Sequence, residues 1–284
     1  MADTPAHGGR RVRARRITFT FPSTMERHFA DDDLVLSHAI AVLSAMFPEG
    51  EEFFVRSVRR YSDQVTDPTL KSQVAGFIGQ EVTHGREHRT LNTRLAEMGY
   101  PTRFVEQVIT IFLKRCEKWL PARVPLAMTA AFEHYTATFA DLLLSDERAR
   151  DLLTSDEIRG VLLWHAYEEV EHKAVAFDVL RMVGASEALR IWSMRVVSVI
   201  FAAGVIAGTT VSLARDRASY NPIRLGRSLN RLRDTPWLTS QVFADLRAYN
   251  RRGFHPSDFD TEYLLDTWHA ELFGDQGRLA GNLR

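Results

Sequence analysis

Apolar residues recur along most of this chain at intervals of three and four, the spacing of one face of an α-helix. No stretch shows the sustained alternation of apolar and polar residues that is typical of a β-strand. Prolines stand near the ends of most apolar stretches, where a helix tolerates them. The pattern therefore predicts an all-α protein.

Capping signals divide the chain into successive helices. An acidic start precedes a helical pattern at 31–47, and Pro48 and Gly50 predict a break or a kink before a second helical stretch at 49–61. Asp67 and Pro68 provide the N-cap and first residue of the next helix, which reaches about residue 98. Further helices are predicted at 103–119, at 121–144 and, as one long helix, at 156–183.

Residues 196–213 form an uncharged stretch of 18 residues, the lower limit for a membrane span. Gly204 and Gly208 have the spacing that permits close helix packing. Two interpretations follow, a fully buried fifth helix of a soluble bundle or contact with a membrane. The sequence favours the buried helix and leaves membrane contact open.

The chain is predicted to have three parts. These are a flexible basic arm at 1–16, a ferritin-like metal-binding helical bundle at 17–215, and an Arg-rich tail of short helices at 216–284 that packs on the bundle. The only cysteine, Cys116, excludes an internal disulfide framework and any zinc site built from cysteines. No apolar segment of a secretory signal follows the early arginines, so we expect a cytoplasmic protein, with membrane association as the alternative.

Charge and size narrow the class of protein. The 284 residues are 45% hydrophobic, which supplies a sizeable core and excludes a wholly disordered chain. Basic and acidic residues balance at 36 each, so no overall positive field attracts nucleic acid. We therefore expect a small-molecule substrate rather than a nucleic-acid partner.

Two Glu-x-x-His pairs carry the candidate chemistry. Glu81 and His84 are three residues apart in a predicted helix and therefore share one face, as do Glu169 and His172. Both pairs lie on stripes of otherwise apolar or small residues, where a charged group is costly unless it is paired or binds metal.

A further glutamate precedes each pair on an earlier helix. The order Glu51, Glu-x-x-His, Glu133, Glu-x-x-His is the ligand pattern of dinuclear carboxylate sites in four-helix bundles. Glutamate and imidazole ligands suit iron or manganese, so two iron ions are predicted, with manganese as the alternative and zinc less favoured. The competing interpretation is a set of interhelical ion pairs. The six predicted ligands are Glu51, Glu81, His84, Glu133, Glu169 and His172.

Other polar residues lie near the predicted ligands along the helices. His88 and His165 stay on the ligand faces and, in antiparallel helices, would meet at one end of the centre. They are predicted as catalytic proton carriers or additional ligands, with hydrogen bonding to a ligand carboxylate as the alternative. Asn92 is a candidate for orienting a ligand. The remaining glutamates of these motifs, predicted to pair with arginines, are Glu52, Glu168 and Glu171.

Four motifs together resemble a known family. The segments FPEGEEFF, FIGQEVTHGREHRTLN, FEHYTA and WHAYEEVEHKAVAFDV are similar to those of the bacterial predicted metal-dependent hydrolases, a ferritin-like helical group. The resemblance covers roughly residues 12–215. It implies a metal-binding bundle with the six predicted ligands at matching positions and His88 and His165 beside them.

Three functions remain open from the sequence. The favoured one is an oxygen-activating di-iron oxidase or oxygenase that acts on a hydrophobic organic substrate, because phenylalanines such as Phe53 and Phe77 surround the motifs. The alternative is a metal-dependent hydrolase, in which two metal ions activate water and polarise the bond that is cleaved. The third is a non-catalytic iron-storage bundle, which would require a cage-forming oligomer. A homo-oligomer is compatible with each of the three.

Overall fold

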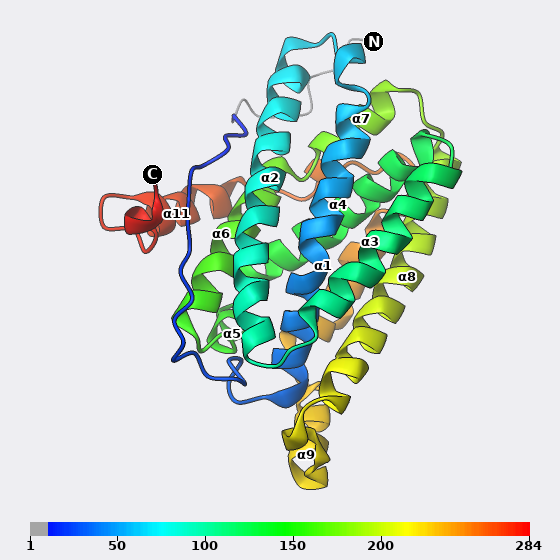
Figure 1. The fold of residues 1–284 in the computed structure, drawn as a ribbon. Coiled ribbons are helices and arrows are strands. Elements are labelled where there is room, and N and C mark those ends of the chain that lie inside the picture. The colour runs from blue at the N-terminus through cyan, green and yellow to red at the C-terminus, as the bar shows by residue number, and fades with distance from the viewer. Residues whose placement is uncertain (1–10) are drawn as a thin grey trace.

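The structure is a computed structural model that describes residues 11–284, and over these residues it is built from helices without a strand. The predicted all-α class is therefore confirmed. Four long helices carry the candidate ligands and lie side by side (Figure 1). They are α1 (Leu34–Arg59), α2 (Pro68–Glu97), α4 (Arg123–Ser145) and α6 (Asp156–His172).

Neighbouring helices in this group run antiparallel. On α1 and α2, Ser44 hydrogen bonds to Asn92, whereas Glu52, eight residues further along α1, pairs with Arg89 earlier on α2. The predicted Asp67 cap is present, and its side chain accepts a hydrogen bond from the backbone N–H of Leu70. Antiparallel packing places the middle of each helix, where the Glu and His residues stand, at one level of the bundle.

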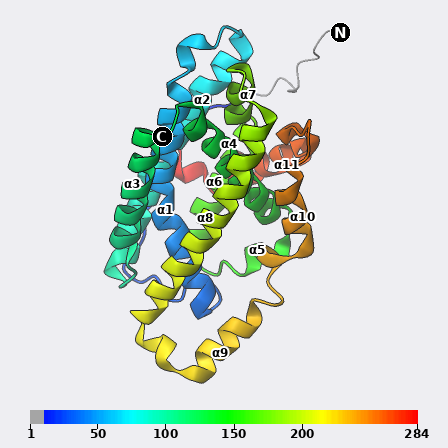
Figure 2. The same cartoon turned by 90° about the vertical axis from the view of Figure 1, so that its right-hand side faces the viewer.

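Two further helices cover the outside of α1. Helix α3 (Thr102–Trp119) follows α2, and α8 (Glu187–Ala214) packs on both α1 and α4 (Figure 2). Gly208 of α8 permits a close approach, because a Cβ atom there would lie 2.7 Å from a methyl group of Val42. The small residues at 204 and 208 thus serve helix packing, as their spacing predicted.

Two predicted helix boundaries are wrong. Helix α1 continues through Pro48 as one element, because buried residues on both sides of the proline, among them Ala45 and Phe53, hold it against its neighbours. The predicted long helix at 156–183 is instead interrupted after His172, and α7 (Val175–Met182) follows as a separate element. Neither Gly nor Pro marks this interruption, so the sequence carried no signal for it.

The chain after α8 consists of short elements. Helix α10 packs on α4, and α11 packs on α6. The predicted division of the chain into three parts stays a prediction. The remaining α-helices are α5 (Glu147–Asp151), α9 (Pro222–Arg231), α10 (Ser240–Ala248) and α11 (Glu262–Phe273), and short 3₁₀ turns span Ser62–Gln64, Arg217–Tyr220, Pro236–Leu238, Pro256–Asp258 and Ala280–Asn282.

The predicted flexible arm is partly ordered. Residues 11–16 run in extended conformation along the bundle, with Val12 buried in the core and Arg15 paired with Glu168 and Glu171. These pairs form because two carboxylates near the end of α6 require a cationic partner, which the sequence assigned to arginines without identifying one. Residues 1–10 of the predicted arm lie outside the described residues.

Helix α8 is long and apolar enough to cross a membrane by length and composition. Only 17% of its most apolar 18-residue window is buried in the protein, so the predicted fully buried fifth helix is wrong. One face of the helix packs on the bundle, and the opposite face is exposed.

Candidate metal centre

The six predicted ligands meet in the middle of the bundle. Each is at most 4% exposed, although four of them are carboxylates. Helix α1 contributes Glu51 and α4 contributes Glu133, while α2 and α6 each contribute one Glu-x-x-His pair. The i, i+3 spacing aims both members of each pair at the same space between the helices.

Two glutamates lie between the paired histidines. Oε1 of Glu81 is 3.1 Å from Nε2 of His172 and 3.7 Å from Nδ1 of His84. Oε1 of Glu169 is 3.6 Å from each of the same two nitrogens. Both carboxylates therefore lie within 4 Å of both imidazoles.

The remaining two carboxylates belong to different groups of possible ligands. Oε2 of Glu133 is 3.2 Å from Nε2 of His172, and these residues form a ligand group with Glu81. Glu51 forms a second group with Glu81 and His84. The two groups share Glu81, which is the arrangement expected of a dinuclear centre.

The outer nitrogen of His84 is held by a buried carboxylate. Nε2 of His84 lies 3.0 Å from Oε2 of Glu168, whose other oxygen accepts from Arg15 at 2.9 Å. Burial alone would raise the pKa of Glu168, but His84 and Arg15 outweigh it and lower this pKa. An ionised Glu168 accepts the Nε2 proton, so Nδ1 of His84 presents a lone pair to the centre.

The outer nitrogen of His172 is held by an amide. Nδ1 of His172 lies 2.8 Å from Oε1 of Gln80, whose Nε2 donates to the carbonyl of Arg13 and to Glu171. Because the amide nitrogen has two acceptors, its oxygen faces the imidazole and accepts the Nδ1 proton. Nε2 of His172 therefore faces the carboxylates. Burial lowers the pKa of His172, but Glu169 and Glu133 outweigh it and raise this pKa well above its ordinary value.

His88 and His165 lie at one end of the centre, as antiparallel packing predicted. Nε2 of His88 and Nδ1 of His165 are 2.8 Å apart, and Nε2 of His165 is 2.9 Å from Oε1 of Glu169 and 3.6 Å from Oε1 of Glu51. Phe47 packs against both imidazole rings. The pair thus adjoins the carboxylates directly.

The hydrogen bonds around His88 determine which nitrogen of each histidine carries the proton. Asn92 donates through Nδ2 to the carbonyl of Ser44, so its Oδ1 accepts from the Ser44 hydroxyl at 2.8 Å. Oγ of Ser44 then accepts from Nδ1 of His88 at 2.9 Å, and Nε2 of His88 accepts from Nδ1 of His165. This order of hydrogen bonds leaves a lone pair on Nε2 of neutral His165, which is aimed at the carboxylates.

Nine buried atoms of the six predicted ligands have no hydrogen-bond partner, although each is aimed at the centre. A buried carboxylate without a donor is costly, so such a set is retained only where a cation or extra protons satisfy it. Oxygen and imidazole donors in this number fit one or two divalent ions. The atoms are both oxygens of Glu51, Glu81 and Glu133, Oε2 of Glu169, Nδ1 of His84 and Nε2 of His172.

Crowding of like charges shifts the ligand pKa values. Burial, with repulsion from Glu81 and Glu169, raises the pKa of Glu51 well above its ordinary value. Burial raises the pKa of Glu133 to about 7 against the attraction of His172. Burial and the neighbouring His84 lower the pKa of His165 to about 4. Without a cation Glu51 and Glu133 thus hold protons more readily than ordinary carboxylates, whereas His165 is neutral near pH 7.

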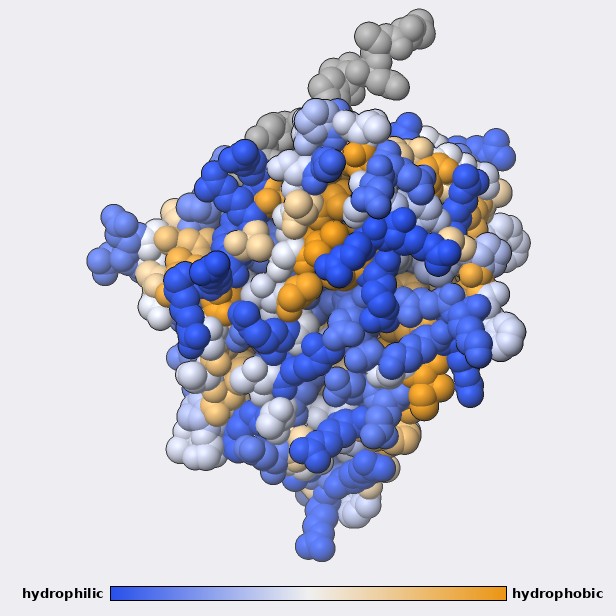
Figure 3. Space-filling model, turned by 45° about the horizontal axis from the view of Figure 1, so that its top comes forward, coloured by the Kyte–Doolittle hydropathy of each residue, from blue (hydrophilic) through white to orange (hydrophobic). Residues whose placement is uncertain are grey.

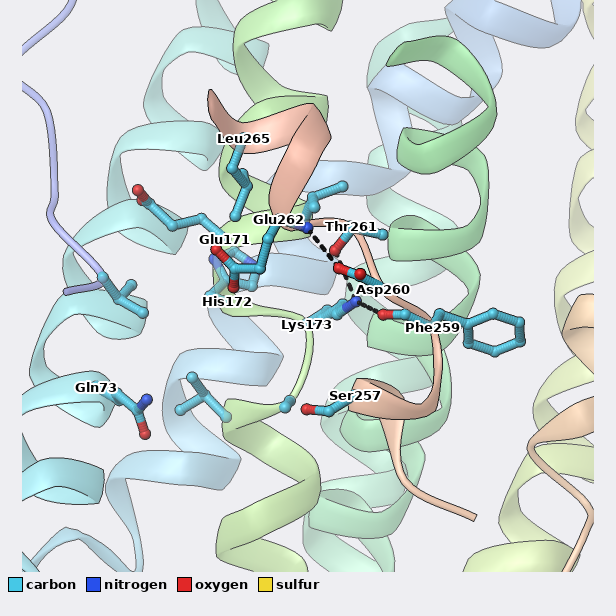
Figure 4. Close-up of a pocket in the computed structure, with 14 residues that line it drawn as sticks. Gln73, Glu171, His172, Lys173, Ser257, Phe259, Asp260, Thr261, Glu262 and Leu265 are labelled. Carbon is cyan, nitrogen blue, oxygen red and sulfur yellow. Dashed lines mark hydrogen bonds between the residues drawn. The ribbon is translucent and has the colours of Figure 1, made fainter. Parts of the chain in front are cut away.

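A cleft of about 230 Å³ borders the centre at His172. Nζ of Lys173 donates there to the carbonyl of Phe259 and to the hydroxyl of Thr261 (Figure 4). The interruption after α6 and the tail segment before α11 form this cleft together. Its lining combines apolar residues with charged ones, namely Val12, Val170, Val175, Phe259, Leu265, Glu171, Lys173, Asp260 and Glu262.

Some of the surrounding residues were predicted and others were not. Glu52, Glu168 and Glu171 pair with arginines, as predicted, and Asn92 holds Ser44 beside His88. The sequence missed Arg15, Ser44 and Gln80. Gln80 stands next to Glu81, but nothing in the sequence showed that it would reach the imidazole of α6.

Fold and site together define an all-helical protein with a buried glutamate–histidine centre suited to metal. Residues 13–260 match the model of a family described as predicted metal-dependent hydrolases. The chain therefore belongs to this family, as its motifs suggested. No curated protein and no solved structure matches the chain, so the ferritin-like grouping stays a prediction.

Proposed function

We propose that this protein binds two metal ions and uses them to hydrolyse an organic substrate. The proposal rests on one observation, the buried atoms of four carboxylates and two imidazoles that face one another without a hydrogen-bond partner. Two iron ions are proposed, with manganese as the alternative. Zinc would serve hydrolysis equally well.

Each residue has a distinct part in this proposal. Glu133 and His172 would hold one ion, Glu51 and His84 would hold the other, and Glu81 and Glu169 are within reach of both. When bound, such ions supply Lewis acidity and lower the pKa of water. Phe77 and Trp164 pack against the rings of His172 and His84 and bury these two imidazoles.

The histidine pair has two roles in this proposal. His165 directs Nε2 toward the centre and is proposed as an additional ligand, because a lone pair 2.9 Å from a carboxylate oxygen is stable only with a cation or a proton nearby. His88 holds a proton at Nδ1 against Ser44 and accepts at Nε2. The two roles of His165 exclude each other, because its Nε2 either binds a cation or accepts a proton from water.

Hydrolysis is placed before oxidation because the family's description names it. Oxidation remains the second candidate, and the observation in its favour is the donor set itself. Carboxylates that can bridge or bind terminally tolerate a change between iron(II) and iron(III). Product formation with and without dioxygen distinguishes the two, since hydrolysis requires none.

The cleft beside His172 suggests the class of substrate. Its combined apolar and charged lining suits a hydrophobic organic molecule with one polar or charged group. The esters and amides of such molecules carry the carbonyl group that a dinuclear centre polarises.

Metal content by mass spectrometry tests the centre directly. The full chain is purified without chelator beside a Glu133→Ala variant and an Asp245→Ala control. About two metal ions per chain in the wild type and in the control, with a clear loss in Glu133→Ala, are expected for a dinuclear site. Two ions retained in Glu133→Ala would make the ligand assignment wrong. No metal in any sample after anaerobic reconstitution would make the buried carboxylates a polar core network and overturn the proposal.

A further inference from the structure

One face of α8 exposes a continuous apolar strip, which we define as Trp192, Val196, Val199, Ala203 and Ile206. These residues recur at intervals of three and four and therefore line one side of the helix. Val199 is 70% exposed and Ile206 68%, whereas buried positions of the same helix face the bundle. Exposure of so long an apolar surface to water is unfavourable, which indicates that the strip is an interaction site.

Neighbouring elements extend this surface. Helix α3 exposes Phe104, Val108 and Ile111 on the same flank of α1, and the ring of Phe104 lies 5.5 Å from the guanidinium carbon of Arg215 at the end of α8. In the space-filling view, apolar patches emerge between charged residues, several of them toward the right, the side on which α3 and α8 lie in Figure 1 (Figure 3). The strip is thus part of a broader exposed face.

Cations and aromatic rings stand at both ends of the strip. At the α8 N-terminal end, Arg195 lies over Trp192, and Lys118 lies over Trp119 at the end of α3. At the other end, Arg215 and Arg217 are exposed beside Tyr220. Aromatic rings and basic side chains around an apolar centre are typical of the region where a bilayer meets water.

Helix α9 continues this pattern beyond the end of α8. It exposes Ile223 and Leu229 together with Arg227, whereas Arg224 and Arg231 pair with Asp32 and Asp31. A short helix with exposed apolar residues and an exposed arginine suits the plane of a membrane surface.

The packing of α8 argues for a helix that lies on the membrane rather than one that crosses it. The face opposite the strip is occupied, since Gly208 approaches Val42 and Phe201 packs 5.0 Å from the ring of Tyr135. Insertion of α8 across a bilayer would strip these contacts from the bundle. Lipid on the strip alone leaves them intact.

A second copy of the chain fits this surface less well than a bilayer does. In a two-fold dimer formed through the strip, each basic end would meet a basic end of its partner, whether the two helices ran parallel or antiparallel. Anionic lipid headgroups, in contrast, complement both ends at once.

We propose that the apolar strip of α8 rests in the surface of a bilayer that contains anionic lipids, with α9 and the exposed residues of α3 beside it. The chemistry that recognises this partner is apolar contact with acyl chains and ion pairing with headgroups. The proposal does not depend on the metal centre, which lies on the inner side of α1.

Sedimentation of the full chain with vesicles tests this inference. Vesicles of phosphatidylcholine with phosphatidylglycerol should carry the protein down, and phosphatidylcholine alone should do so more weakly. The double variant Val199→Glu with Ile206→Glu should bind at least about tenfold more weakly. Phe243→Glu, at an exposed apolar residue of α10, should bind like the wild type. Circular dichroism and metal content should be unchanged in both variants.

Two further measurements decide between the occupants. Addition of vesicles should shift tryptophan fluorescence to shorter wavelength, and Trp192→Phe should lose most of this shift. Light scattering gives the mass in solution. A wild-type dimer that becomes monomeric in the double variant, without vesicle binding, would assign the strip to a second copy. That outcome overturns the proposal, as does equal vesicle binding by the wild type and the double variant.

Discussion

Nη1 of Arg15 lies 2.9 Å from Oε1 of Glu168. Glu168 in turn contacts the imidazole of His84. The same guanidinium contacts Glu171, which accepts from Gln80, and Gln80 contacts the imidazole of His172. A residue from the N-terminal segment thus holds both imidazoles of the Glu-x-x-His pairs. Its contacts keep these rings oriented and their outer protons in place.

We therefore expect Arg15→Met to weaken metal binding by about ten- to a hundredfold, the usual effect of losing a partner behind a ligand. A competitive titration against a metal-binding dye measures this change. Arg16→Met, at an exposed neighbouring position, is the control and should bind like the wild type. Equal affinity in Arg15→Met would show that the histidines need no support from this segment.

The shared position of Glu81 predicts different metal counts for two variants. Glu81→Gln removes a group common to both ion positions and should abolish binding of both ions. Glu133→Gln affects one position only, so it should retain about one ion per chain. Mass spectrometry of the intact metal-loaded chain counts the ions. If both variants lost the same number, Glu81 would not be a bridge.

The direction of the hydrogen bonds around His88 predicts different roles in metal binding for His88 and His165. His165 directs a lone pair at the carboxylates, whereas His88 is one step removed. His165→Ala should therefore lower metal affinity by at least about tenfold, and His88→Ala should lower it much less. Electron paramagnetic resonance of the manganese-loaded variants would report the coordination change. A larger effect in His88→Ala would reverse the assignment.

The raised pKa of Glu133 predicts how metal binding depends on pH. A proton held near pH 7 competes with the cation, so metal affinity should rise as pH increases through about 7. Titrations between about pH 5.5 and about pH 8.5 would follow this change. Affinity that was constant over this range would show that Glu133 is already ionised.

The same pKa predicts a stability difference in the metal-free protein. The pKa of Glu133 is raised from 4.5 to about 7 on folding, so its contribution is present below pH 4.5 and is lost as pH rises through about 7. Wild type should therefore lose stability relative to Glu133→Gln over this range. Comparison with the variant is required because the lowered pKa values of His88 and His165 act in the opposite sense. Thermal unfolding at several pH values measures the difference.

Close packing of α8 on α1 predicts the effect of filling Gly208. The methyl groups of Val42 leave no room for a larger side chain, so Gly208→Val should destabilise the protein by about 1–3 kcal/mol. Gly226→Ala in α9 is the control, since its Cβ would meet open space, and it should stabilise by at most about 1 kcal/mol. Thermal unfolding compares the two. An unchanged midpoint in Gly208→Val would show that α8 shifts freely on α1.

Local patterns in the sequence determined the helices and the candidate ligands. Helical spacing and caps placed the starts of the four long helices, because both depend on residues within one turn of each other. The i, i+3 spacing of Glu81 with His84 put two ligands on one face for the same reason. The antiparallel order of two such helices then brought His88 to His165.

Contacts between distant segments were decided only by the tertiary structure. Arg15 reaches Glu168 across 153 residues, and Ser44 meets His88 across 44, with no periodic signal in the sequence for either contact. The interruption after His172 likewise arises where Lys173 meets the segment before α11. The exposure of one face of α8 depends on which helices pack on α8. Composition alone does not distinguish a buried helix from one that faces lipid.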